Sequence, residues 1–157
     1  MNSKDRMTGV AAVLREATGA EGIVLEDDGS IAFGLDEDMG VRIFPVVDED
    51  DDESADEALG LAVAIVVGRV EADDAHTMFD LLSANYLTVG SGGGAFAIDK
   101  ETGLLVLQHL FTLKSDDDQE SFVDEFAHLV GAARAFNARL KRQAASSDVN
   151  ALQGVKI

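Results

Sequence analysis

One stretch of this 157-residue chain, Asp80–Ile98, limits the possible folds more than any other. It reads DLLSANYLTVGSGGGAFAI, so a short amphipathic helix runs into four glycines within five residues, and an apolar strand begins directly after them. This strand opens a hairpin, because DKETG is a turn signal and LLVLQHLFT follows as a second strand. A helix followed by two strands that neighbour each other in sequence is typical of an α+β fold.

The segments before this stretch predict one helix and a group of strands. Residues 5–18 repeat apolar side chains every three or four positions, which places them on one face of a helix. Pro45, the only proline, cannot donate a hydrogen bond to a ladder and therefore predicts a sheet edge or the end of its strand. Strand-like patterns occur in four segments, at residues 23–25, 30–35, 39–47 and 58–70.

The chain after the hairpin predicts a long helix and a tail. Ser115 followed by three aspartates is a strong helix start, and apolar side chains then keep helical spacing for about five turns, as far as Leu140. Residues 143–157 are polar and aperiodic, so we expect a mobile tail there. The expected fold is a single α+β domain over residues 1–142, in the order helix-β-β-β-helix-β-β-helix, with a mostly antiparallel five-stranded sheet.

The charge of the chain excludes some classes of partner. The formal net charge is −18, and residues 131–157 hold one of the 30 acids but five of the 12 bases. A field this negative repels nucleic-acid phosphates and anionic membranes and attracts basic partners. No cysteine is present, the N-terminus lacks the apolar core of a signal peptide, and the longest apolar run, Leu61–Val67, is too short to span a bilayer. We therefore expect a soluble cytoplasmic protein that binds no nucleic acid and does not insert into membranes.

The sequence offers no identifiable catalytic or metal site. The acidic run at residues 48–53 lacks the glycine and the bidentate glutamate that a calcium loop needs at its sixth and twelfth positions. Residues 90–95 match G-x-G-x-x-A, but they precede a strand where a phosphate-binding loop precedes a helix. His76, His109 and His128 are far apart in sequence. We expect no catalytic residues, no bound metal and no cofactor. The alternative is an enzyme, which would have titratable residues gathered in a polar pocket.

Apolar faces are more numerous than one small pair of layers can cover. Taken singly, each apolar position on the first helix and the first strands is more often a core residue than a binding residue. Taken together, three helices and one sheet supply more apolar surface than they can bury against each other. A sheet with helices on one side leaves another surface that needs a partner, which predicts a protein-binding function.

The order of elements resembles that of the class I type III secretion chaperones, the Tir-chaperone family. The resemblance rests on LLSANYL, the glycine-rich turn, the short apolar strand and the hairpin that ends in LLVLQHLF. It implies a homodimer with two-fold symmetry in the bacterial cytoplasm. Such a dimer binds the extended N-terminal segment of one or more secreted effector proteins and keeps them soluble and competent for secretion, without ATP or a cofactor.

The resemblance also implies roles for individual residues. The second helix and the strand after the glycine-rich turn would form the dimer contact, through Met78, Phe79, Leu82, Phe96 and Ile98. The first helix and the first strands would form grooves for an effector that adds a strand at a free edge, through Val10, Leu14, Ile31, Phe33, Val41 and Ile43. An alternative is a domain of the same fold that mediates interactions or regulation and has no link to secretion.

Overall fold

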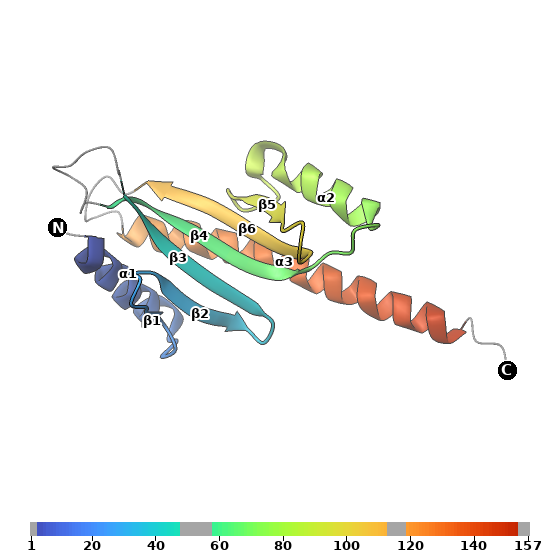
Figure 1. Ribbon diagram of the computed structural model, residues 1–157, viewed down its shortest axis with the longest axis horizontal. Helices are drawn as coiled ribbons and strands as arrows, with labels where there is room; N and C mark the ends of the chain where they lie inside the picture. Colours follow the sequence, from blue (N-terminus) through green and yellow to red (C-terminus); the bar gives the residue numbers. More distant parts are fainter. Residues whose placement is uncertain (1–2, 48–57, 113–118, 154–157) are drawn as a thin grey trace.

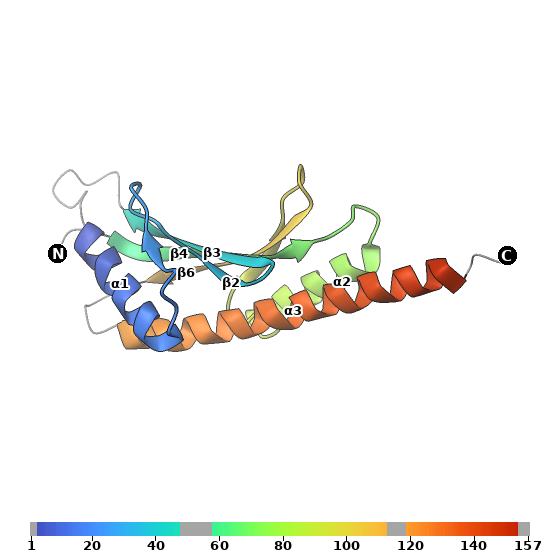
Figure 2. The same cartoon turned by 90° about the horizontal axis from the view of Figure 1, so that it is seen from below.

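Figures 1 and 2 show the computed structural model, which describes residues 3–47, 58–112 and 119–153. Within these ranges the chain forms three α-helices, one short 3-10 helix (η1) and six strands. Their bounds are α1 (Ser3–Thr18), β1 (Val24–Leu25), β2 (Ile31–Asp36), β3 (Met39–Val47), β4 (Ala58–Arg69), α2 (Ala75–Asn85), η1 (Tyr86–Thr88), β5 (Ala95–Ile98), β6 (Leu104–Thr112) and α3 (Gln119–Gln153).

The strands form one antiparallel sheet in the order β1-β2-β3-β4-β6-β5. This confirms the predicted α+β fold, but the count of five strands is wrong, because β1 adds a sixth among the described residues. Val24 and Leu25 pair with β2 across a tight turn, in which the Asp28 carboxylate accepts hydrogen bonds from the Ser30 amide (2.9 Å) and hydroxyl (2.6 Å). The sequence shows a strand-like segment at residues 23–25, but the expected count of five strands did not include it.

Pro45 lies within β3, which pairs with a neighbour on each side. The pairing with β2 ends at Ile43, so Pro45 faces only Leu61 of β4. The predicted sheet edge is therefore confined to this part of β3. Proline has no N–H to donate, and on the β2 side of Pro45 no described strand would accept one.

The helices cover one face of the sheet and leave the other face bare among the described residues (Figure 2). The register makes the covered face apolar, since side chains from neighbouring strands align across it. Val41 and Ile43 of β3 lie opposite Ile65 and Val63 of β4, and all four are buried. The intervening residues point to the bare face, where Phe44 pairs with Ala62.

The long helix α3 continues into the segment that was predicted to be a tail. It is helical as far as Gln153, so residues 143–153 continue the helix, and the mobility expected for residues 143–157 stays a prediction. In Figure 1 its C-terminal part extends beyond the sheet. The acidic run at 48–57 and the helix start at Ser115, with the predictions made for both, lie outside the described residues.

A buried asparagine joins α3 to an irregular point of the sheet. The pairing of β4 with β6 shifts register between Val66 and Gly68, so the carbonyl of Val67 lies in a bulge. The Asn137 side chain is buried and donates from Nδ2 to this carbonyl (2.8 Å) and to the Asp38 carboxylate (3.2 Å). The bond from Asn137, followed by the one from Lys141, holds the pKa of the Asp38 carboxyl below its usual value.

We expect Asn137→Ala to lower the free energy of unfolding by about 1–3 kcal/mol, because a buried carbonyl loses its donor. Urea denaturation followed by circular dichroism measures this change. The control is Arg134→Ala on the same helix, since the Arg134–Asp36 ion pair is exposed and is expected to contribute less than about 1 kcal/mol. Equal losses for the two variants would contradict the role of Asn137.

Candidate functional site

The six residues predicted to bind an effector all lie in the core. Their exposed fractions are at most 8 %, the value for Phe33. The physical reason is that α1 and α3 pack on the same face of the sheet, so one helix covers what the other leaves open. The side chains of Val10, Ile31, Val41 and Ile43 therefore offer no open groove in this structure.

 Leu14 and Phe33 differ from the other four because they line a cleft at the surface. The cleft has a volume of about 440 Å³, and its walls are mainly apolar. It lies between α1, β2 and α3, and its lining includes Leu14 and Thr18 of α1, Phe33 and Leu35 of β2, and Val123, Phe126 and Val130 of α3.

The edge of β2 beside this cleft is open. β2 pairs with β1 only at Ile31 and Ala32, so no described strand lies on the outer side of residues 33–36. The Ser30 carbonyl accepts a bond from Glu26 on the β1 side, and the backbone of Gly34 faces the same way because strands repeat every two residues. A free strand edge next to an apolar cleft is the geometry that accepts an added strand.

A pair of opposite charges lies beside the cleft. Arg134, which lines it, donates from Nε to the Asp36 carboxylate at 3.0 Å and from Nη2 at 3.3 Å. Both side chains are partly exposed, so this pair shapes the rim more than it stabilises the fold.

The residues predicted for a dimer contact are divided between surface and core. Phe79 and Leu82 of α2 are 69 % and 71 % exposed, and Tyr86 beside them is 74 % exposed. Met78 and Ile98 are half-buried and line one cleft between α2 and the β5–β6 turn. Phe96 is buried, with its ring 4.3 Å from that of Phe136. The contact itself stays a prediction.

Asn85 ties the end of α2 to the edge strand β5. Its side chain donates from Nδ2 to the Phe96 carbonyl (3.0 Å) and accepts from the Phe96 amide (2.7 Å). The amide side chain thus takes the place of a neighbouring strand at Phe96, which closes this edge to an added strand at that point. The sequence analysis included Asn85 only as one letter of the LLSANYL pattern. A hydrogen bond to the backbone of a residue 11 positions away leaves no periodic signal in the sequence.

The glycine-rich turn after α2 is tight. A Cβ on Gly92 would lie 2.5 Å from the His128 carbonyl oxygen, so α3 leaves room only for glycine. The buried Ser91 hydroxyl bonds the carbonyls of Thr88 and Gly94. Leu87 and Thr88 adopt positive φ angles of 55° and 56°, which are unfavourable for residues with a side chain.

No group of three or more His, Cys, Asp or Glu side chains within the described ranges is arranged to hold a metal ion. His76 lies 3.5 Å from Asp80, and the His109 ring packs on Phe111. None of the helices in the described part of the chain combines the length and hydropathy that a membrane span requires.

The sequence matches the Tir chaperone protein (CesT) family over residues 12–137. The chain belongs to this family. The resemblance to the Tir-chaperone family is therefore confirmed. A chaperone family is not a class of enzymes. No curated protein sequence is significantly similar to this chain.

Solved structures show the same fold. A chain of the ExsC-ExsE complex is 19 % identical, with a TM-score of 0.65 over 88 % of this chain and 96 % of that chain. A chain of the HopA1-SchA chaperone-effector complex is 14 % identical, with a TM-score of 0.59 over 87 % and 96 %. A chain of the heterodimeric ExoU-SpcU complex from the type III secretion system of Pseudomonas aeruginosa is 18 % identical, with a TM-score of 0.54 over 83 % and 93 %.

Proposed function

We propose that this protein is a class I type III secretion chaperone of the bacterial cytoplasm. As a homodimer it binds the extended N-terminal segment of one or more effector proteins and keeps them soluble and competent for secretion. The observation that carries this proposal is the open edge of β2 beside an apolar cleft, in a chain of the Tir chaperone family. The complexes formed by its structural neighbours support it.

The geometry suits a partner that has not folded. An added strand satisfies its backbone with β2, and its alternate side chains reach the cleft lined by Leu14 and Phe33. Binding needs no covalent step, so neither ATP nor a cofactor has a role in it. The net charge of −18 favours segments with basic residues and keeps the complex soluble.

The energetics require a contact larger than the cleft alone. Each ordered residue of the segment costs about 1–2 kcal/mol of backbone entropy. Burial of apolar surface returns about 25 cal/mol per Å². A tight complex therefore needs an interface on the order of 2,000 Å², which a segment reaches by wrapping around the dimer.

Co-purification from the native host tests the proposal. The full chain with an affinity tag is expected to retain a secreted protein through its N-terminal segment, and deletion of the chaperone gene is expected to reduce the soluble amount of that protein. If no secreted protein is retained and none depends on the chain for solubility, the proposal is wrong.

A further inference from the structure

The loop between α1 and β1, residues 19–22, lies beside the slot that an effector strand would occupy. β1 pairs with β2 so that Val24 lies opposite Ala32. The same register, continued by two residues, would place Gly22 opposite Gly34. β1 begins only at Val24, so this pairing is not made and the backbone of Gly34 stays open. The position of the loop therefore decides whether the slot is free.

Arg15 of α1 holds both ends of this loop. Its carbonyl accepts a hydrogen bond from the Gly19 amide (2.9 Å). Its guanidinium donates to the Ile23 carbonyl from Nε (3.0 Å) and from Nη2 (2.6 Å). Hydrogen bonds from a charged donor are stronger than those between neutral groups. A single residue thus closes residues 19–22 into a tight loop at the end of α1.

The loop is near enough to the open edge to close it. Ala20 and Gly34 line the same cleft, Ala20 next to α1 and Gly34 on β2. A Cβ on Gly22 or on Gly34 would meet no atom within 4 Å, so both backbones have free space around them. An unpaired strand edge gains hydrogen bonds from an extended segment within reach. Without the bonds from Arg15, residues 19–22 would be such a segment.

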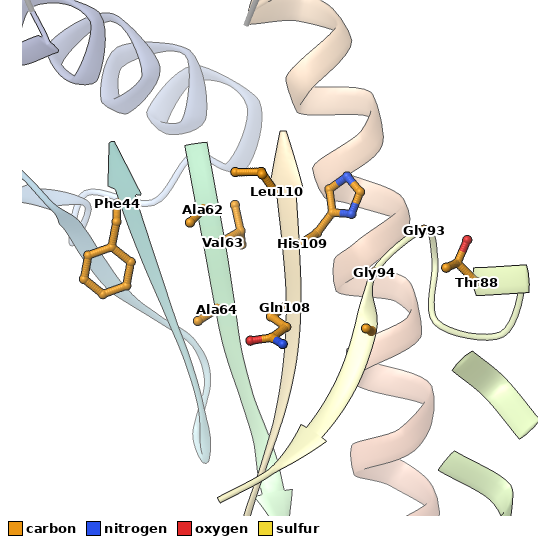
Figure 3. Close-up of a pocket in the computed structure, with 11 residues that line it drawn as sticks. Phe44, Ala62, Val63, Ala64, Thr88, Gly93, Gly94, Gln108, His109 and Leu110 are labelled. Carbon is orange, nitrogen blue, oxygen red and sulfur yellow. The ribbon is translucent and has the colours of Figure 1, made fainter. Parts of the chain in front are cut away.

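A second apolar hollow of the sheet lacks this free backbone. It lies on the bare face, has a volume of about 580 Å³ and is lined by residues that include Phe44, Ala62 and Leu110 (Figure 3). These three residues belong to β3, β4 and β6, which pair with one another there, so their backbone bonds are already made. At the edge of β2, an apolar cleft and open backbone lie together. Access to this edge therefore controls the addition of a strand.

We propose that Arg15 is a positioning residue for effector binding, because it holds residues 19–22 away from β2 and keeps the slot beside Gly34 open. When its bonds to Ile23 are lost, β1 extends to Gly22 and occupies the row of the sheet that the effector strand would take. The inference rests on the proposed function for the identity of the partner. Closure of the slot, however, is a property of the free protein.

Hydrogen exchange of the free protein tests this closure. In Arg15→Ala the Gly34 amide is expected to exchange at least about 10-fold more slowly than in the unmodified chain, because the Gly22 carbonyl would accept its hydrogen bond. If Arg15 only stabilised the fold, its loss would leave this exchange unchanged or make it faster. The matched control is Arg142→Ala, which removes an exposed arginine from α3 and is expected to leave the exchange at Gly34 unchanged.

Gly22→Pro in the Arg15→Ala background is the second variant. Proline has no N–H to donate and its ring cannot lie against a paired strand, so β1 cannot extend through position 22. We expect the fast exchange at Gly34 to return in this double variant. Effector affinity, expected to fall about 10-fold in Arg15→Ala, is expected to return with it. Exchange at Gly34 that is not slowed in Arg15→Ala, or that stays slow in the double variant, would overturn the proposal.

The role of Arg15 and the proposed function fail separately in these experiments. If a secreted protein is retained but Gly34 of Arg15→Ala exchanges as in the unmodified chain, the role of Arg15 is wrong and the proposed function stands. If exchange at Gly34 slows as expected but no variant retains a secreted protein, closure of the slot stands and the proposed function is wrong.

Discussion

Replacing Phe79 and Leu82 together by glutamate is expected to convert the proposed dimer into a monomer. Both side chains are exposed on the same face of α2, so their loss leaves the core unchanged. Two-fold symmetry places each substitution in the contact twice. At about 1.5–3 kcal/mol for each buried apolar side chain, four losses weaken the dimer by about 6 kcal/mol or more, which is about 10⁴-fold in the dissociation constant.

Analytical ultracentrifugation of the double variant measures this effect. The mass is expected to fall from twice 16.6 kDa to 16.6 kDa, with an unchanged circular dichroism spectrum. His76→Glu serves as the control, because it adds negative charge to an exposed position of the same helix without removing an apolar side chain. A double variant that sediments as the unmodified dimer would show that α2 lies outside the contact.

Gly34→Pro is expected to weaken effector binding about 10–100-fold. The Gly34 backbone faces the open edge of β2, and proline removes its N–H and places a ring where the added strand would lie. The loss of one or two backbone hydrogen bonds accounts for about 1.4–2.8 kcal/mol. Isothermal titration with the effector segment recovered by co-purification measures the change.

Gly34→Ala is the matched control for this prediction. A Cβ at Gly34 meets no atom within 4 Å, so alanine fits, and it retains the N–H that proline lacks. We expect the alanine variant to bind as the unmodified chain does. Equal weakening by proline and alanine, or no weakening by either, would show that the backbone of β2 does not pair with the effector.

The regular elements could be predicted because each carries a local pattern. The hairpin formed by β5 and β6 follows from an alternating pattern on both sides of DKETG, and β3 has the predicted bounds. The strand-like segment at residues 23–25 is too short to fix its place in the sheet, because β1 depends on the turn at Asp28 and on pairing with β2. The extension of α3 to Gln153 runs through a polar segment without a helical apolar repeat.

The candidate site could be predicted only in part, since periodicity identifies an apolar face but not what covers it. Leu14 and Val10 share a face of α1, yet only Leu14 reaches the cleft, because α3 covers the rest. Phe79 and Leu82 were placed on one face of α2, and their exposure could not be known before α2 was placed on the sheet. The bonds of Asn85 to Phe96 arise from tertiary structure alone.

Hydrogen exchange at the backbone of residues 33–36 tests the central claim most directly. The open edge of β2 leaves the Gly34 amide without a described partner, so it is expected to exchange fast in the free protein. Binding of the effector segment is expected to slow this exchange strongly, because the added strand accepts its hydrogen bond. Unchanged exchange at residues 33–36 in a saturated complex would contradict the claim that the effector adds a strand to β2.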